Sequence, residues 1–172
     1  MPEIEARAEE AAKRLVGRLV QGNQTLVLAE SCTAGLVSDL ITRVSGASAA
    51  FWGSFVCYSP QAKELMLNIN GAFLKRYGLV SRETAREMAS RVLEITGVSI
   101  SAAVTGLAGP LGDGSNTPVG TIWIAAAWRE GAEIRRREKE LHFPGARAEV
   151  RMLAAAAVLE ELLDVLNSAA IT

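Results

Sequence analysis

Tyr58 and Lys63 are spaced so that their side chains would meet at the start of a helix, which makes them the first candidates for a chemical role. Ser59 followed by Pro60 is typical of a helix N-cap followed by the first helical residue. Tyr58 then precedes the cap and Lys63 is the fourth helical residue, two positions whose side chains meet in a hydrophobic staple. A phenol and an amine would lie together at a helix N-terminus, where the helix dipole disfavours an ammonium charge. The pair predicts a proton-transfer unit.

Ser31 is the candidate nucleophile from which this unit would remove a proton. It lies between a short apolar segment and a helix-like stretch. Backbone N–H groups at such a junction have no intrahelical acceptors and can stabilise an oxyanion. Serine at this position is more often only an N-cap, but no Glu or Gln follows three residues after Ser31 or Thr33 to form a capping box. Cys32 is the competing nucleophile, although most buried free cysteines are inert.

Lysine or tyrosine is the remaining candidate for the base. The single histidine, His142, lies in a charged late segment, which disfavours a Ser-His-Asp triad and a histidine-based metal site. Lys63 would need its pKa lowered by about three units from about 10.4, which costs about 4 kcal/mol. A helix terminus provides about 1–2 kcal/mol of this, and burial or a neighbouring cation must provide the rest. The alternatives are a solvated lysine and an ordinary tyrosine at a strand end.

A glycine-rich segment from Gly106 to Gly120 follows another apolar stretch. It has neither the Gly-Lys-Ser/Thr ending of a P-loop nor the dinucleotide-binding fingerprint. Closely spaced glycines allow backbone N–H groups to approach an anionic group, and Thr105 and Ser115 would add hydroxyl donors. Arg147, at the start of the last helix, would pair with a phosphate. The alternatives are a plain surface connection and a surface arginine.

Alternating helices and strands are expected to position these residues. The patterns of apolar residues predict helices over about 3–20, 35–43, 60 onward, 81–97 and 147–166, and strands over about 25–29, 51–58, 99–105, 119–128 and 132–141. The last two strands form a hairpin, and the Arg and Glu residues of the second are typical of a protected edge strand. This order predicts a layered α/β domain with a mixed sheet.

Composition limits the class of protein. The 172 residues, 49% hydrophobic and 22% charged, predict one globular domain over 1–172. The net charge of −1 gives no general drive toward nucleic acid or anionic membranes, and no apolar run is long enough to span a bilayer. Two cysteines, Cys32 and Cys57, without a signal-peptide pattern, predict free thiols and a cytoplasmic protein.

Several spaced motifs resemble the CinA C-terminal domain family. They run from Leu28 to Gly35, from Gly53 to Tyr58 with Lys63 following, from Thr105 to Pro110 and from Pro118 to Thr121. The resemblance covers nearly the whole chain, from about residue 5 to 168. Stand-alone members of this family include bacterial nicotinamide mononucleotide deamidases.

The resemblance implies a three-layer α/β/α fold and hydrolysis of the carboxamide of nicotinamide mononucleotide to nicotinic acid mononucleotide and ammonia. It implies Ser31 as the nucleophile, with Tyr58 and Lys63 as its proton-handling partners, and no metal or organic cofactor. The chain departs from the family at Leu111, where members often carry glycine or a small polar residue.

On this hypothesis, backbone N–H groups from Cys32 to Gly35 bind the oxyanion and the glycine-rich segment binds the phosphate of a small-molecule mononucleotide. Substrate contacts are expected from Thr33, Gly35, Thr105, Gly106, Gly109, Ser115 and Arg147. One alternative is a non-catalytic nucleotide-binding module linked to competence or DNA damage; another is a hydrolase of a different small carboxamide. The alanine-rich face from Ala154 to Ala157 permits close helix packing within one chain or in a homo-oligomer.

Overall fold

The computed structural model describes residues 1–169 and 171. In chain order the elements are α1 (Pro2–Gln21), β1 (Leu26–Glu30), α2 (Leu36–Thr42), the short 3₁₀ helix η1 (Ala47–Ala49), β2 (Phe51–Val56), α3 (Pro60–Leu67), α4 (Gly71–Tyr77), α5 (Arg82–Thr96), β3 (Ile100–Gly106), β4 (Thr121–Glu130), β5 (Glu133–His142) and α6 (Arg147–Ser168). No helix among these residues is long and apolar enough to cross a membrane.

The five strands form one mixed sheet in the order β2-β1-β3-β4-β5. β1 is parallel to both of its neighbours, and β4 and β5 continue the sheet as an antiparallel hairpin. All five residues of β1 are buried, because helices cover both faces of the sheet at this strand. The predicted mixed sheet is confirmed, with the charged strand β5 at one edge.

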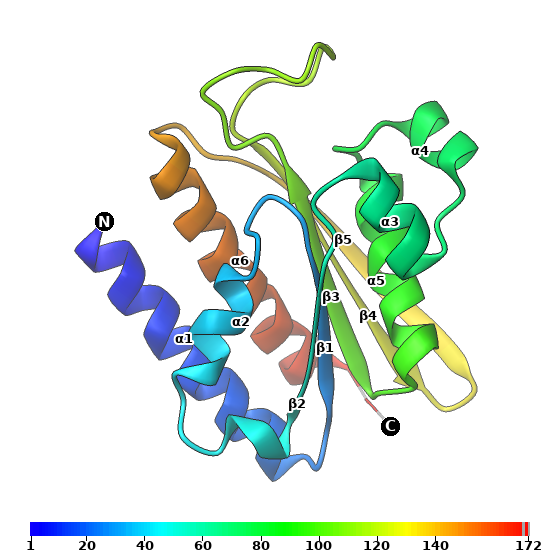
Figure 1. Ribbon diagram of the computed structural model, residues 1–172. Helices are drawn as coiled ribbons and strands as arrows, with labels where there is room; N and C mark the ends of the chain where they lie inside the picture. Colours follow the sequence, from blue (N-terminus) through cyan, green and yellow to red (C-terminus); the bar gives the residue numbers. More distant parts are fainter. Residues whose placement is uncertain (170, 172) are drawn as a thin grey trace.

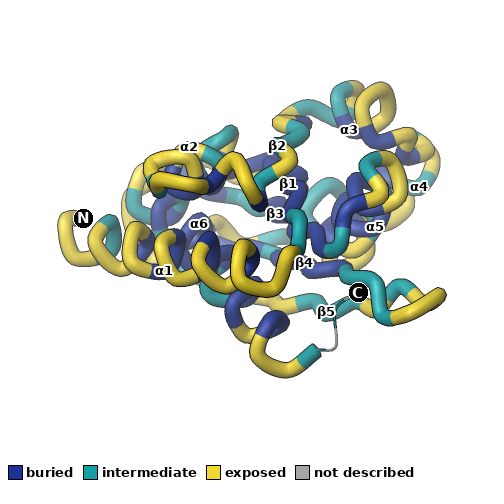
Figure 2. The backbone as a smooth tube through the Cα atoms, turned by 90° about the horizontal axis from the view of Figure 1, so that it is seen from below, coloured by how far each residue is buried: buried dark blue, intermediate teal, exposed yellow. Residues whose placement is uncertain are grey.

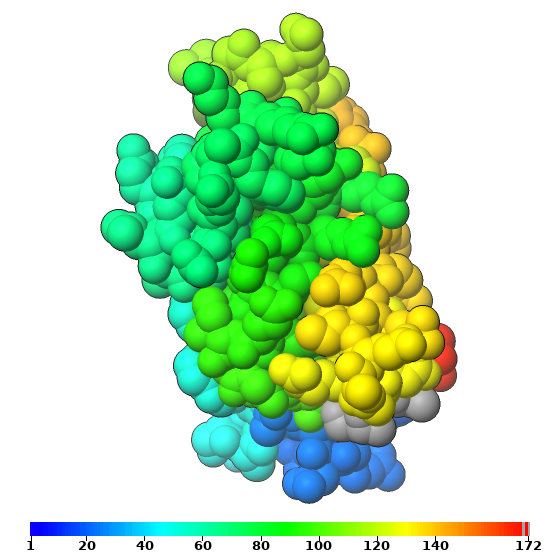
Figure 3. All heavy atoms as spheres, turned by 90° about the vertical axis from the view of Figure 1, so that its right-hand side faces the viewer, coloured from blue at the N-terminus to red at the C-terminus, as the bar shows by residue number. Residues whose placement is uncertain are grey.

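Helices cover the two faces of the sheet in separate layers (Figure 1). α1, α2 and α6 pack on one face, and α3, α4 and α5 pack on the other, which Figure 3 shows from outside. Buried residues are concentrated along the strands and the inward sides of the helices (Figure 2). The three-layer α/β/α architecture is therefore confirmed.

The alanine-rich part of α6 is buried inside this one chain. Ala154, Ala155 and Ala156 have almost no exposed surface and belong to the cluster that includes the apolar side of α1. Small side chains let two helices approach closely. This face is therefore used for packing within the chain.

Two segments differ from the sequence-based expectation. α4 was not predicted, although Asn70 caps it by accepting a hydrogen bond from the Ala72 N–H at 2.7 Å. The strand predicted over 51–58 ends at Val56. The glycine-rich segment forms an irregular connection beyond the carboxyl end of β3 (Figure 1).

Candidate active site

The predicted chemical groups meet at the carboxyl ends of the three parallel strands. Ser31 directly follows β1, Tyr58 and Lys63 follow β2, and Thr105 lies near the end of β3. Because parallel strands end at the same edge of a sheet, these residues converge there.

A pocket of about 210 Å³ lies at this edge. It is lined by Ser31, Cys32, Tyr58, Lys63, Leu79, Val80, Thr105, Gly106, Leu107, Ala108, Gly109, Leu111, Asp113 and Arg147. A larger groove of about 870 Å³ between α1 and α2 contains none of the predicted site residues and is lined largely by apolar side chains. The smaller pocket is the candidate site because Ser31, Tyr58 and Lys63, the predicted catalytic residues, line it.

The amine of Lys63 lies against the hydroxyl of Ser31. Nζ is 2.9 Å from the Ser31 Oγ and 2.8 Å from the carbonyl oxygen of Cys57, and Lys63 is only 1% exposed. The carbonyl can only accept, so an N–H of Lys63 is directed to it. In the neutral amine the lone pair is then free to accept the Ser31 proton.

Burial lowers the pKa of Lys63, because the ammonium form loses its hydration inside the protein. Neither of its hydrogen-bond acceptors is a carboxylate. The predicted cap of α3 is also confirmed: the Ser59 Oγ accepts a hydrogen bond from the Ala62 N–H at 3.1 Å. Lys63 therefore lies at a helix start, as the sequence predicted, and the burial that a lysine base requires is found in the structure.

A buried carboxylate that the sequence reasoning missed holds one side of the turn after Ser31. The side chain of Glu30 accepts hydrogen bonds from the Thr33 hydroxyl at 2.8 Å and from the N–H groups of Gly35, Val37 and Ser38 at 2.9–3.1 Å. Thr33 and Gly35 were expected to bind substrate, but these donors are already committed to Glu30. The available signal was an acidic residue at the end of an otherwise apolar strand.

Arg151 of α6 holds the other side of the same turn, and it too was missed. Its Nε donates to the carbonyl oxygen of Cys32 at 3.0 Å and its Nη2 to that of Thr33 at 2.6 Å. The C=O and N–H of a trans peptide point in opposite directions, so the Thr33 N–H is directed away from Arg151. The Ala34 N–H donates to the Ser31 carbonyl at 3.1 Å.

Two backbone donors of this turn remain available. Within the described part of the chain, the N–H groups of Cys32 and Thr33 have no hydrogen-bond acceptor. Cys32 directly follows Ser31 and Thr33 comes next, so both N–H groups are close to the hydroxyl along the chain, and an acyl-transfer enzyme needs such donors beside the oxyanion. The N–H groups of Ala34 and Gly35 have acceptors within the chain. Of the donors expected up to Gly35, only those of Cys32 and Thr33 are therefore unpaired, and of these two residues Cys32 lines the pocket.

The two cysteines beside the site are poor nucleophiles. Burial raises the pKa of Cys32 to about 12 and that of Cys57 to about 11. The reactive form of cysteine is the thiolate, which is scarce at neutral pH for such thiols. The hydroxyl of Ser31, next to an amine, is the better candidate.

Position 106, at the end of β3, is occupied by glycine, and there is no space for a side chain. A Cβ at this position would approach the Ile122 Cδ1 to 2.3 Å, the Thr121 carbonyl oxygen to 2.8 Å and the Cys32 Sγ to 3.2 Å. The adjacent Thr105 hydroxyl donates to the carbonyl of Leu79 at 2.7 Å. Both residues line the pocket, and Thr105 ties the end of β3 to the connection before α5.

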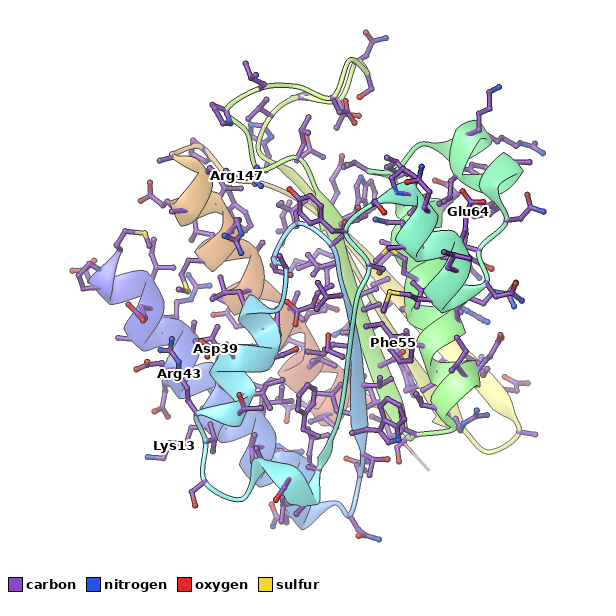
Figure 4. The ribbon with its side chains drawn as sticks, in the orientation of Figure 1. Lys13, Asp39, Arg43, Phe55, Glu64 and Arg147 are labelled. Atoms are coloured by element: carbon purple, nitrogen blue, oxygen red, sulfur yellow. The ribbon has the colours of Figure 1, made fainter. Side chains whose placement is uncertain are left out.

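Arg147 connects three segments around the pocket. Its guanidinium donates to the Tyr58 hydroxyl at 2.8 Å and to the Gly109 carbonyl at 2.7 Å, and Figure 4 places it below the glycine-rich segment. Both acceptors are uncharged, so its positive charge is not neutralised by them. Tyr58 and Lys63 were expected to lie together as a proton-transfer unit, but no hydrogen bond joins them among the described residues, and the exposed phenol pairs with Arg147 instead.

The structure does not bring Ser115 to the pocket. Its hydroxyl donates to the Asp113 carboxylate at 2.6 Å in an exposed part of the glycine-rich segment. Asp113 itself lines the pocket and carries the wrong charge for binding a phosphate. His142 is absent from the pocket lining, and no group of His, Cys, Asp and Glu in the described residues could hold a metal ion.

Comparison with known proteins identifies relatives of this chain. A family model, the CinA C-terminal domain, matches residues 8–166. A protein named nicotinamide-nucleotide amidohydrolase PncC, from Enterobacter agglomerans, is 36% identical over 159 residues, which are 92% of this chain and 95% of that protein. A CinA-like protein of Syntrophomonas wolfei is 42% identical over 84% of this chain. The chain spans about a third of the length of that relative, since the match covers 34% of it.

Solved structures agree with the fold. A CinA superfamily protein of Escherichia coli has a TM-score of 0.86 and 32% identity, covering 92% of this chain and 90% of that one. The competence damage-inducible protein A of Klebsiella pneumoniae has a TM-score of 0.88 and 28% identity, covering 94% of this chain and 98% of that one.

Proposed function

The chain belongs to the CinA C-terminal domain family, and from this membership and the site we propose that it is an amidohydrolase acting on nicotinamide mononucleotide. The products are nicotinic acid mononucleotide and ammonia. The observation that carries the proposal is the 2.9 Å separation between the Ser31 Oγ and the buried Nζ of Lys63. The name of the similarly sized Enterobacter relative supports the substrate.

The first half of the reaction forms an ester on Ser31. The neutral amine of Lys63 takes the hydroxyl proton as the Oγ attacks the carboxamide carbon. The N–H groups of Cys32 and Thr33 donate to the oxygen, which gains negative charge. The Lys63 ammonium returns the proton to the departing nitrogen, and ammonia leaves as the C–N bond breaks.

The second half of the reaction is hydrolysis of that ester. Lys63, again neutral, takes a proton from water as the water oxygen attacks the acyl carbon. The same backbone donors stabilise the second oxyanion. Collapse breaks the ester bond, and the Ser31 oxygen regains its proton from Lys63. All steps use side chains of this chain, backbone N–H groups and water.

The pocket of about 210 Å³ is smaller than the roughly 300–1,000 Å³ of sites that enclose a whole drug-sized ligand, so we infer that it takes the carboxamide-bearing ring and not the whole mononucleotide. The ribose phosphate then extends to the rim, where Arg147 provides a positive charge. Tyr58 would leave its bond to Arg147 or orient the guanidinium toward the phosphate. Thr105 and Gly106, at the end of β3, also line the pocket.

Ammonia release from nicotinamide mononucleotide tests the proposal. We expect activity in the wild type and in Cys32→Ala, and loss of activity in Ser31→Ala and Lys63→Ala. Full activity in Ser31→Ala would reject the assignment, and loss in Cys32→Ala alone would favour the thiol. Calorimetry that detects nucleotide binding while no ammonia is released would indicate a non-catalytic nucleotide-binding module.

A further inference from the structure

The hydroxyl of Thr105 is placed beside the proposed nucleophile by the pairing of two strands. The Ser31 N–H donates to the Val104 carbonyl at 3.0 Å, which continues the parallel register of β1 and β3 by one residue and sets Ser31 opposite Thr105. Neighbouring strands of a sheet lie about 4.7–4.9 Å apart. The two residues are therefore direct neighbours across the adjacent ends of β1 and β3 (Figure 1).

Both side chains face the layer that contains α3 and α5. Ala29 and Ala103, which are paired two residues earlier, belong to the apolar cluster on this side of the sheet, and side chains two residues apart in a strand share a face. The contacts agree, since the Ser31 hydroxyl bonds to Lys63 and the Thr105 hydroxyl bonds to the connection that precedes α5. The Thr105 hydroxyl thus lies on the same side of the sheet as the groups that would carry out the reaction.

The proton of the Thr105 hydroxyl is already bonded within the chain. The hydroxyl oxygen is 2.7 Å from the carbonyl oxygen of Leu79, and a carbonyl can only accept, so the hydroxyl donates to it. A hydroxyl oxygen can also accept, and no hydrogen bond of the described residues ends on this one. Thr105 is only 1% exposed and lines the pocket. Toward a ligand in the pocket, this buried group is therefore an acceptor and not a donor.

The site thus combines unpaired donors with an acceptor. The N–H groups of Cys32 and Thr33 follow Ser31 in the chain, whereas Thr105 belongs to the neighbouring strand. A carboxamide has the matching groups, which are a carbonyl oxygen that accepts and an NH2 group that donates. A carboxylate has two accepting oxygens and no N–H.

We propose that the Thr105 oxygen accepts a hydrogen bond from the NH2 group of the substrate carboxamide, and that this residue determines the preference for an amide over an acid. The inference rests on the proposed function. With the nitrogen held at Thr105, the carbonyl oxygen faces the N–H groups of Cys32 and Thr33, and the reverse orientation sets two acceptors against each other. The acid product also sets an oxygen against Thr105, which favours its release. A hydroxyl that donated to the product would have to leave the Leu79 carbonyl, which costs free energy.

Two substrates that differ in the leaving group test the role of this hydroxyl. The carboxamide of nicotinamide mononucleotide provides N–H donors, and the methyl ester of nicotinic acid mononucleotide does not. Thr105→Val removes the hydroxyl at nearly constant size and should lower kcat/KM for the carboxamide by about 10–10²-fold, because the NH2 group loses its acceptor. It should leave kcat/KM for the ester nearly unchanged, so the ratio of amide to ester hydrolysis falls. Thr105→Ser retains the hydroxyl and should retain the wild-type ratio.

Thr84→Val is the matched control. The Thr84 hydroxyl is also buried and donates to the Gly78 carbonyl at 2.6 Å, in the same connection before α5, but Thr84 is not part of the pocket lining. Thr84→Val should therefore keep the wild-type ratio, although it removes a similar hydrogen bond to this connection. Equal losses for amide and ester in a folded Thr105→Val sample, or a ratio that falls as far in Thr84→Val, would assign Thr105 to structure alone and overturn the proposal.

Calorimetry separates this inference from the proposed reaction, because it measures binding alone. In Ser31→Ala, the addition of Thr105→Val should raise the Kd of nicotinamide mononucleotide and should not raise the Kd of nicotinic acid mononucleotide. Thr105→Ala, measured in the same way, provides a second variant if circular dichroism shows that Thr105→Val does not fold. A preference between amide and acid that neither substitution changes would overturn the inference, even if the wild type releases ammonia. A wild type that releases no ammonia and binds neither nucleotide would refute the proposed function itself.

Discussion

Replacing Lys63 is the sharpest test of the proposed chemistry. A lysine with an ordinary pKa of about 10.4 is neutral in only about one molecule in 2,500 at pH 7, and each unit by which its pKa falls raises that fraction about tenfold. Lys63→Arg keeps a positive charge at every accessible pH because the guanidinium does not lose its proton. A general base contributes about 10²–10⁴-fold to a rate. We therefore expect Lys63→Arg and Lys63→Ala to lower kcat/KM by about 10³-fold.

The direction in which kcat/KM changes with pH tests whether the neutral form of Lys63 is the active one. The active form of Lys63 is neutral and burial lowers its pKa, so wild-type activity should rise with pH and level off above that lowered pKa, which lies below the ordinary value of 10.5. In Lys63→Ala, small primary amines should restore part of the activity in proportion to the concentration of their free base. Ser31→Ala should gain nothing from the same amines. Activity of Lys63→Arg within tenfold of the wild type, or a wild-type rate that falls with rising pH, would refute the role of the amine.

Four further outcomes follow from the geometry. Arg151→Met should lower kcat by about 10–10²-fold with KM nearly unchanged in steady-state assays, because the Cys32 and Thr33 peptides lose their orientation. Arg147→Met should raise KM for nicotinamide mononucleotide by about tenfold or more, but not KM for the riboside that lacks the phosphate, since a charge-assisted bond to phosphate is worth about 1.5–3 kcal/mol. Ser115→Ala should leave both KM values unchanged, because Ser115 bonds to Asp113 away from the pocket. Lys63→Met should unfold at a higher temperature than the wild type near pH 7 in calorimetry, and this difference should shrink as the pH approaches 10.5. The sign follows because burial opposes the ammonium form, so its cost to folding grows as the pH falls below the unfolded pKa.

Each of these has an outcome that would contradict it. Equal losses in Arg151→Met and Arg151→Ala accompanied by unfolding in circular dichroism would assign the arginine to stability alone. A riboside KM that rises together with the mononucleotide KM in Arg147→Met would mean that the arginine does not contact the phosphate. A raised KM in Ser115→Ala would return that hydroxyl to the site. A Lys63→Met variant less stable than the wild type at pH 7 would mean that the lysine is buried as a satisfied cation.

The features predicted correctly are those encoded over a few neighbouring residues. Ser59 and Pro60 define the start of α3 by capping and by a fixed φ angle, both local effects. The apolar run of β1 predicts a strand buried on both faces, and parallel strands bring Ser31 and Lys63 to one edge of the sheet. The Ser31–Lys63 contact therefore followed from local patterns and one rule of topology.

The features that were missed depend on contacts between distant parts of the chain. Arg151 is 119 residues from Cys32, and nothing near either residue indicates that a guanidinium will bind that carbonyl. In the sequence, Glu30 is only the last residue of a strand. Its role depends on the folded turn, in which the N–H groups of Gly35 and Ser38 donate to the Glu30 carboxylate. The expectation that Ser115 binds substrate is not met for the opposite reason, which is a local contact. The Ser115 hydroxyl bonds to Asp113, two residues away, and this acceptor competes with any ligand.

The attachment of Arg151 has a consequence for how the molecule matures on the ribosome. Ser31 and Lys63 are synthesised early, yet the turn beside them is oriented by a side chain of α6, a 22-residue helix that is made after all the strands of the sheet. A nascent chain that stops before residue 147 can carry the serine and the amine but cannot fix the backbone donors beside them. The proposed activity would thus arise only after α6 has been synthesised, so chains that stop before it should release no ammonia from nicotinamide mononucleotide.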